Sequence, residues 1–269
     1  MNAEEAIAAV ALISSLGIVA DACELLNPDN VLDKFFNWNV TRHRFAWLAG
    51  EHSILGFLTQ TRPLQVLIAV RAVAAVAFPF CLIAHVPYSA LLPLFVLSVI
   101  FLVRLRLPYS FNGADQMQTL IWAALSGYAL TGDEVGQFVV LGFIAAQAIL
   151  SYVAAGWLKL ATVTPFWRDG TAVGRVLQTD TFGMPKLAEK IPLKPFSAIV
   201  SWSTIVFETF GPVLIFFGPT ATLVFISAAF VFHAAIGITM GLNRFLFAFP
   251  ATFPALYWAS VQIQNWIHL

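Results

Sequence analysis

Long apolar runs separated by short polar breaks make up most of this chain. Each run has about 15–24 residues, near the length that a helix needs to cross a bilayer core of about 30 Å. The pattern predicts an all-α polytopic membrane protein, a bundle of about eight transmembrane helices, with seven or nine as alternatives. The predicted spans are Ala3–Ala20, Leu64–Ala84, Ser89–Val103, Ala114–Leu130, Gln137–Leu160, Phe196–Phe217, Pro219–Met240 and Phe245–Ile267.

Composition points the same way. The chain is 59% hydrophobic and 10% charged, with a mean hydropathy of +0.83, well beyond the values of a soluble domain. We find no internal repeat, no low-complexity tract and no separate soluble domain. We therefore expect a single transmembrane helical domain over residues 1–269.

Lysine and arginine gather on one side of the predicted spans. The breaks after the first, third, fifth and seventh spans, with the adjoining helix ends, contain every Lys and Arg except Arg71. The opposite side carries His85, Asp133, Glu134, Glu4 and Glu5. Because cytoplasmic loops collect Lys and Arg, we predict that the basic side is cytoplasmic. Both termini would then lie outside a bacterial cytoplasmic membrane.

Two segments on the basic side are long enough to carry structure. Leu32–Gln60 mixes aromatic residues with Arg and His, as in FFNWN and HRFAW. This mixture suits helices that lie in the headgroup layer. Ala161–Lys194 is interrupted by Gly170, Gly183, Pro185 and Pro192, which predicts short re-entrant or interfacial helices.

Five titratable groups fall inside the predicted spans or at their ends, where a charge costs about 2.5–3.5 kcal/mol on insertion scales. They are Arg71, Asp115, Lys159, Glu208 and His233. Groups of this kind normally face a protein interior and have a partner there. We therefore expect a polar cavity that opens to the cytoplasm or to the lipid of the inner leaflet.

A purely structural role is the alternative for each of these groups. Arg71 and Glu208 would then form a buried ion pair that fixes helix packing. Lys159 and Arg244 would extend to the lipid headgroups, and His233 would hydrogen-bond a neighbouring carbonyl.

Common soluble catalytic signatures are missing from the sequence. It has no G-x-S-x-G, no H-E-x-x-H, no Walker loop and no Cys/His metal spacing. Cys23 and Cys81 fall near opposite faces of the predicted bundle, so we expect two small buried hydrophobic residues and no disulfide. We predict no bound metal and no nucleic-acid partner.

Three sequence blocks carry a family resemblance. SYVAAGWLKL followed by PFWRDG has the small pair Ala155–Gly156, then Lys159, Trp167 and Gly170. FETFGPVLIFFG has an acidic residue before Gly-Pro, and FHAAIGITMGLNRFLFAFPATFPALYWA has a histidine ahead of a helix break. In this order, over roughly Val66–Ala259, the blocks resemble the horizontally transferred transmembrane (HTTM) family, which is related to vitamin K-dependent gamma-carboxylase.

The resemblance implies a membrane enzyme. The animal carboxylase oxidises a hydroquinone with oxygen, and the resulting strong base removes a proton from peptidyl glutamate before carbon dioxide adds. The lysine that matches Lys159 is implied to deprotonate the hydroquinone, a role that suits a desolvated lysine. Where the carboxylase has Asn-His, this chain reads FNGADQM, with Asn112 in place and Asp115 as the nearest ionisable group.

Two further features distinguish the chain from the animal carboxylase. It ends at Leu269 without a soluble domain that would hold a propeptide, and its charge bias places Lys159 at the cytoplasm. Bacterial relatives that assist the maturation of ribosomal peptide toxins suit such an opening better.

We therefore expect an integral-membrane enzyme, similar to a carboxylase or quinol oxidase, that acts on a quinol-like or peptide substrate at the cytoplasmic half of the membrane. A hydroquinone is the expected cofactor. The predicted catalytic residues are Lys159, Asp115 and His233, and the predicted substrate or cavity residues are Arg71, Asn112, Trp167, Glu208 and Arg244.

The alternative is a noncatalytic membrane subunit, or a peptide maturation or export partner, whose basic loops dock a soluble protein at the cytoplasmic face. A passive transporter ranks third, because no inverted repeat with broken helices is detectable. Membrane lipids are expected partners in every case.

Overall fold

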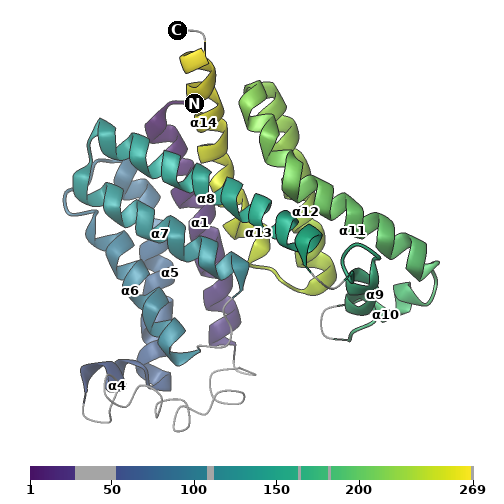
Figure 1. Cartoon of the computed structure of the whole chain (residues 1–269). Coiled ribbons are helices and arrows are strands. Elements are labelled where there is room, and N and C mark those ends of the chain that lie inside the picture. The colour runs from purple at the N-terminus through teal and green to yellow at the C-terminus, as the bar shows by residue number, and fades with distance from the viewer. Residues whose placement is uncertain (28–52, 108–111, 163–164, 181–182, 268–269) are drawn as a thin grey trace. The chain divides into compact units, whose positions relative to one another are not determined.

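The fold is described from a computed structural model, for residues 1–27, 53–107, 112–162, 165–180 and 183–267 (Figure 1). These residues form helices and connecting turns, and no strand. Five helical segments in this part of the chain are long and apolar enough to cross a membrane. They are α1 (Ala3–Leu26), α5 (Thr61–Ile83), α8 (Glu134–Ala161), α11 (Leu193–Phe210) with its continuation η2 (Gly211–Phe217), and α12 (Pro219–Met240). The predicted all-α class is confirmed, and the five segments support an integral membrane protein.

The remaining helices are shorter, less apolar or interrupted. They are α4 (Ile54–Leu58), α6 (Leu91–Arg106), α7 (Gly113–Thr131), α9 (Thr171–Leu177), α10 (Pro185–Ala188), α13 (Phe245–Ala248), η3 (Pro250–Thr252) and α14 (Phe253–Ile267). Helices α6 and α7 match the third and fourth predicted spans, and the eighth predicted span is divided among α13, η3 and α14. All eight predicted spans are thus helical, whereas the number that crosses the membrane stays a prediction.

The two predicted interfacial segments have different outcomes. Most of Leu32–Gln60 lies outside the described residues, and only α4 is seen there. Ala161–Lys194 does contain short helices, α9 and α10. Their position at a membrane surface stays a prediction.

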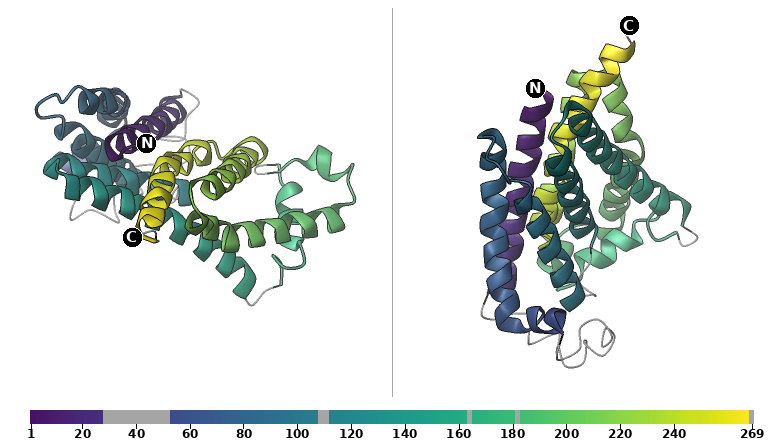
Figure 2. Two further views of the ribbon diagram at one scale, coloured as in Figure 1. Left: turned by 90° about the horizontal axis from the view of Figure 1, so that it is seen from above. Right: turned by 90° about the vertical axis from the view of Figure 1, so that its left-hand side faces the viewer.

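The described chain divides into two compact units, Met1–Val140 and Leu141–Leu269, and α8 runs from the first into the second. In the first unit α1 packs along α5 and α7, and α6 packs against both α5 and α7 (Figure 2). A buried apolar cluster joins three of these helices: Ala22, Leu25, Leu64, Ile68, Val99, Val103 and Leu107. Each of α1, α5, α6 and α7 thus contacts two of the other three. The single domain over residues 1–269 stays a prediction.

A proline inside α5 creates the polar contact that joins α1 to α5. Pro79 has no N–H to donate, so the carbonyl of Ala75, four residues earlier, loses its usual helical partner. The hydroxyl of Ser15 on α1 donates to that carbonyl over 2.6 Å and also lies 2.7 Å from the carbonyl of Ala11 in its own helix. Water cannot supply this hydrogen bond in the core of a bilayer, so a neighbouring helix does.

A second proline ends α11 in the second unit. Pro212 cannot donate to the carbonyl of Glu208, and its ring clashes with that carbonyl in a continuing α-helix. The backbone proceeds instead as the tighter 3₁₀ helix η2. Gln264 of α14 donates from Nε2 to the carbonyl oxygen of Phe216 over 2.9 Å, and α12 packs against η2, α13 and α14. The break leaves Glu208 in the last turn of α11.

The cysteines differ from the prediction in their burial. Neither Cys23 nor Cys81 forms a disulfide, as expected, but Cys23 is exposed and Cys81 is partly exposed. The prediction of two buried residues is therefore wrong. A small apolar side chain on a membrane helix has no need of a protein interior, because lipid is itself apolar.

The hydrogen bond from Ser15 gives a direct test of the fold. Replacing Ser15 with Ala leaves the carbonyl of Ala75 buried without its donor, and we expect this to destabilise the protein by about 1–3 kcal/mol. Ser98→Ala is the matched control, because the hydroxyl of Ser98 bonds only to Leu94 in its own helix on an exposed face. Denaturant-induced unfolding in detergent micelles measures both variants. Equal stabilities would contradict this role of Ser15.

Candidate functional site

The second unit holds an ion pair between two helices of membrane-spanning length. Lys159 lies in the last turn of α8, and its Nζ donates to Oε2 of Glu208 in the last turn of α11. The two side chains are only 17% and 8% exposed. The ring of Trp167 lies over the lysine, with its centroid 5.0 Å from Nζ. Because the face of an indole ring attracts a cation, the ammonium group is held from two sides.

A glycine brings the two helices close enough for this pair. A Cβ atom added to Gly156 would lie 2.4 Å from Oγ1 of Thr209 and 2.7 Å from its backbone nitrogen. Such distances leave no room for a side chain, so α8 and α11 touch through their backbones here. Tyr152, Gly156 and Lys159 are spaced by four and three residues and share one face of α8. The helix contact thus lies between two functional side chains of the same face.

A buried tyrosine–histidine pair lies on that face of α8 as well. Oη of Tyr152 is 2.7 Å from Nε2 of His233 on α12, and His233 is 2% exposed. The imidazole stacks on the ring of Phe249, with centroids 4.2 Å apart. Nδ1 of His233 has no hydrogen-bond partner among the described residues. An imidazole with one nitrogen engaged and one available can pass on a proton.

The two pairs are connected through Tyr152. The ring of Phe207, next to Glu208, packs edge-on against the ring of Tyr152, with ring centroids 6.0 Å apart. Lys159, Glu208, Tyr152 and His233 therefore form two neighbouring pairs of ionisable side chains, which we refer to as a line, drawn from α8, α11 and α12. This line is the candidate functional site.

The segment before α9 is fastened to α11, which fixes the position of Trp167. The hydroxyl of Ser201 donates to the carbonyl of Trp167, and Nε1 of Trp202 donates to the carbonyl of Arg168 over 2.9 Å. Gly170 has a φ of 80°, and a Cβ there would lie 2.5 Å from the backbone nitrogen of Ala198. Backbone packing of this kind holds the indole over Lys159.

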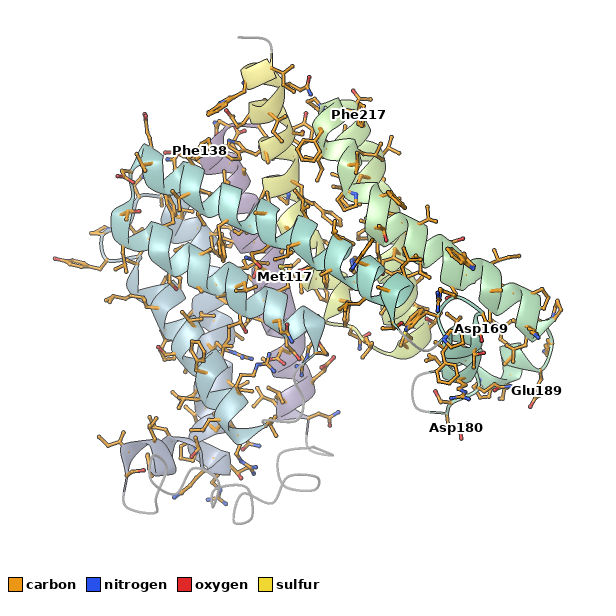
Figure 3. All side chains as sticks on the ribbon, in the orientation of Figure 1. Met117, Phe138, Asp169, Asp180, Glu189 and Phe217 are labelled. Atoms are coloured by element: carbon orange, nitrogen blue, oxygen red, sulfur yellow. The ribbon has the colours of Figure 1, made fainter. Side chains whose placement is uncertain are left out.

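Acidic residues on this side of the unit lie outside the site. Figure 3 shows Asp169, Asp180 and Glu189 around α9 and α10, near the start of α11 and away from Phe217 at the end of η2. The N–H of Thr171 donates to the carboxylate of Asp169 over 2.8 Å, and this bond lowers the pKa of Asp169 below its ordinary value. Asp169 is therefore an ionised turn residue at neutral pH.

The first unit pairs its buried charges internally. Arg71, which is 1% exposed, binds Asp21 of α1 with 2.5 Å between Nη2 and Oδ2. Asp115 lies 3.0 Å from Nη2 of Arg104. Asp115 also forms a capping box with Asn112 at the start of α7, which satisfies two backbone N–H groups.

These partners change several sequence interpretations. The alternative pairing of Arg71 with Glu208 is wrong, because Arg71 binds Asp21 and Glu208 binds Lys159. Lys159 does not simply extend to headgroups, and His233 contacts a phenol rather than a carbonyl. Each of the five groups from which we expected one shared cavity has a partner within its own unit. Neither unit by itself contains all five.

The other predicted site residues have simpler positions. Asn112 is the N-cap of α7, and Arg244 lies directly before α13, partly exposed. The catalytic role of Asp115 and the substrate or cavity roles of Arg71, Asn112 and Arg244 stay predictions. Lys159, Glu208 and Trp167 are the predicted residues that the structure brings together.

Two residues that form these contacts, Asp21 and Tyr152, were not identified from the sequence. Asp21 was placed beyond the first span, but α1 continues to Leu26, and the Asn-Pro pair that follows was the available signal for its end. Tyr152 lies seven residues before Lys159, two turns away on the same helix face. That spacing, with Gly156 between them, was the available signal for the second residue.

Comparisons of the chain with protein-family models, curated proteins and solved structures found no match. The HTTM resemblance accordingly stays a proposal that rests on the residues of this chain. Among the described residues no group of three or more His, Cys, Asp or Glu side chains gathers as metal ligands would.

The contact at Gly156 gives a test of the site's construction. Gly156→Ala places a methyl group against the backbone of Thr209, so we expect the helices to separate, the ion pair of Lys159 to weaken and stability to fall by about 1–3 kcal/mol. Gly142→Ala on the same helix is the control, because a Cβ there meets nothing within 4 Å. Denaturant unfolding in micelles compares the two. If Gly156→Ala is as stable as Gly142→Ala, α8 and α11 do not touch at this point.

Proposed function

We propose that this chain is an integral-membrane enzyme of the HTTM type, similar to vitamin K-dependent gamma-carboxylase. Its acid–base unit is the Lys159–Glu208 pair, and its substrate is a quinol-like molecule or a peptide at the cytoplasmic half of the membrane. The observation that carries the proposal is this buried pair under the ring of Trp167, formed between the last turn of α8 and the interior of the apolar segment Leu193–Phe217.

The ion pair with Glu208 supplies a route by which Lys159 becomes the expected base. A protonated lysine cannot accept a proton, and an ion pair keeps Lys159 protonated. Burial penalises both charges, so transfer of the proton from Lys159 to Glu208 leaves a neutral amine beside a neutral acid. The free amine then accepts the hydroxyl proton of a quinol, and the resulting ammonium group stabilises the quinolate anion.

The surroundings of the pair suit an aromatic substrate. The indole of Trp167 offers a ring on which a quinol ring can stack, at the spacing of about 4.5–7 Å common for aromatic pairs. Oγ1 of Thr209, next to Glu208, is buried without a hydrogen-bond partner among the described residues. It lies in the contact with Gly156, where a Cβ would already be 2.4 Å away. Tyr152 and His233 would carry the proton held by Glu208 away from the pair.

A lysine-to-arginine exchange separates a catalytic role from a structural one. Lys159→Arg keeps a cation beside Glu208, but a guanidinium group does not release its proton in proteins. We expect the variant to fold normally and to lose activity by about 100-fold or more, the usual contribution of a general base. Quinol-dependent oxygen consumption in proteoliposomes, with Lys190→Ala as an exposed-lysine control, measures the effect. An active Lys159→Arg enzyme would remove the proposed base.

We further propose eight spans, both termini outside and α9 and α10 at the cytoplasmic membrane surface. Charge bias supports this orientation, because Asp133 follows α7 on the acidic side and Lys190 follows α10 on the basic side. On a background in which Cys23 and Cys81 are replaced by Ser, Asp133→Cys should react with an impermeant maleimide on intact cells. Lys190→Cys should react only after permeabilisation. The reverse labelling pattern would invert the topology.

A noncatalytic membrane subunit is the second candidate. The observation in its favour is that α9 and α10 expose basic side chains near the start of α11, among them Lys186 and Lys190. In this case a soluble partner would bind the basic segment, and binding would survive the Lys159→Arg exchange. If a partner protein co-purifies with the chain only when Lys186 and Lys190 are present, and its binding does not depend on Lys159, the noncatalytic subunit is favoured over the enzyme.

A further inference from the structure

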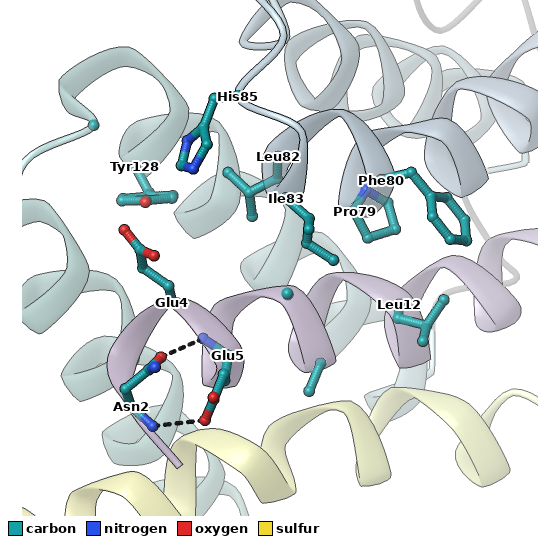
Figure 4. Close-up of a pocket in the computed structure, with 13 residues that line it drawn as sticks. Asn2, Glu4, Glu5, Leu12, Pro79, Phe80, Leu82, Ile83, His85 and Tyr128 are labelled. Carbon is teal, nitrogen blue, oxygen red and sulfur yellow. Dashed lines mark hydrogen bonds between the residues drawn. The ribbon is translucent and has the colours of Figure 1, made fainter.

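A cavity of about 660 Å³ lies in the first unit, apart from the candidate site. Its lining comes from the first turns of α1, the last turns of α5, the turn after α5 and the end of α7 (Figure 4). Its size is within the usual range of about 300–1,000 Å³ for small-molecule sites. Every lining residue belongs to the unit Met1–Val140.

The polar groups of this cavity gather at one end. Figure 4 shows the carboxylate of Glu4 and the rings of Tyr128 and His85 close to one another. Tyr128 is 7% exposed, although its ring borders the cavity. Glu5 is turned aside, because its carboxylate accepts the backbone N–H of Asn2 over 2.9 Å in the helix cap. Glu4 is therefore the acid that faces the cavity.

The remaining lining is apolar and open toward the surroundings of the unit. Leu12, Phe80 and Ile83 line the cavity and are 44%, 60% and 65% exposed. Exposed side chains of this kind on helices of spanning length are suited to contact with acyl chains. The cavity thus has a polar end and an apolar flank, as an amphiphilic ligand requires.

The charge around the polar end is acidic. Glu4, Glu5, Asp133 and Glu134 lie there, at the start of α1 and between α7 and α8. The described Lys and Arg of this unit lie in the first half of α5 or in the last turn of α6: Arg62, Arg71, Arg104 and Arg106. An anionic headgroup would meet only like charges from these acids, whereas a cationic one would be attracted.

We propose that this cavity binds a phospholipid with a primary ammonium headgroup. The ammonium group donates charge-assisted hydrogen bonds to the carboxylate of Glu4. The hydroxyl of Tyr128 and the imidazole N–H of His85 donate to the phosphate. One acyl chain lies along Leu12 and Ile83. This binding is independent of the function proposed for the second unit.

The chemistry of the headgroup predicts which of the common phospholipids binds most tightly. A trimethylammonium group has no N–H to donate and is too bulky for the contact with Glu4, and a glycerol headgroup leaves the phosphate charge unbalanced near four acids. Of these three headgroups, only ethanolamine has a cationic N–H donor for Glu4 together with a phosphate acceptor for His85 and Tyr128. We therefore expect selectivity for phosphatidylethanolamine over phosphatidylcholine and phosphatidylglycerol with the same acyl chains.

Native mass spectrometry of the purified full chain in detergent, titrated with each of these three lipids, tests the proposal. We expect phosphatidylethanolamine to bind most tightly, and Glu4→Gln to weaken its binding about tenfold, as loss of one charge-assisted hydrogen bond does. Glu134→Gln is the control, since Glu134 belongs to the same acidic end without lining the cavity. Ala8→Leu, which fills the cavity without a charge change, should block binding as well.

Any other outcome contradicts the proposed lipid site. Equal binding of phosphatidylethanolamine and phosphatidylcholine, or tighter binding of phosphatidylglycerol, contradicts the proposed headgroup recognition. Unchanged binding in both Glu4→Gln and Ala8→Leu, with normal unfolding curves, places any bound lipid elsewhere. None of these variants lies in the second unit. The activity attributed to Lys159 can therefore be measured separately from lipid binding, and failure of one proposal does not imply failure of the other.

Discussion

A buried charge, or a backbone carbonyl that a proline leaves without its donor, needs a partner from the protein inside a membrane, because the bilayer core offers no water. This constraint accounts for the main polar contacts of the structure. Ser15 satisfies the carbonyl that Pro79 leaves without a donor, and Asp21 neutralises Arg71. In the second unit Lys159 and Glu208 meet for the same reason. These contacts join α1 to α5 and α8 to α11. The few buried polar side chains of this apolar sequence thus lie where helices pack together.

The sequence was sufficient to predict the helices, but it was not sufficient to predict which side chains pair between them. Apolar runs have a length and boundaries that can be read along the chain, and α12 begins and ends where predicted, at Pro219 and Met240. Pairing depends on rotation and register between helices, which a single sequence does not encode locally. The pairing of Arg71 with Asp21 shows the difference, since Asp21 was assigned to a loop and Glu208 was considered as the partner instead. Two predicted site residues that share one short segment, Lys159 and Trp167, do lie together, whereas their roles stay predictions.

The line of Lys159, Glu208, Tyr152 and His233 consists of buried contacts, so a change made to test the proposed chemistry also affects stability. Breaking one member of a buried pair leaves the other charge without compensation, at a cost of about 3–5 kcal/mol. A loss of function after deletion of Lys159 therefore says little about catalysis, because the same change unfolds the site. Exchanges that preserve charge and alter only proton release are the informative ones. Arginine meets that condition for Lys159, since it keeps the cation and removes the titration.

The Lys159–Glu208 pair is not the only contact that holds α8 against α11. The backbone contact at Gly156 and Thr209 already brings the helices together, and Trp167 is fastened to α11 by its own carbonyl. Apolar residues of similar volume often replace a buried ion pair without loss of stability, and sometimes with a gain. A membrane helix gives even less reason to retain a lysine, because its insertion is costly. A charge pair that is costly to insert, beside an indole ring held in place by α11, therefore supports the proton transfer that we propose.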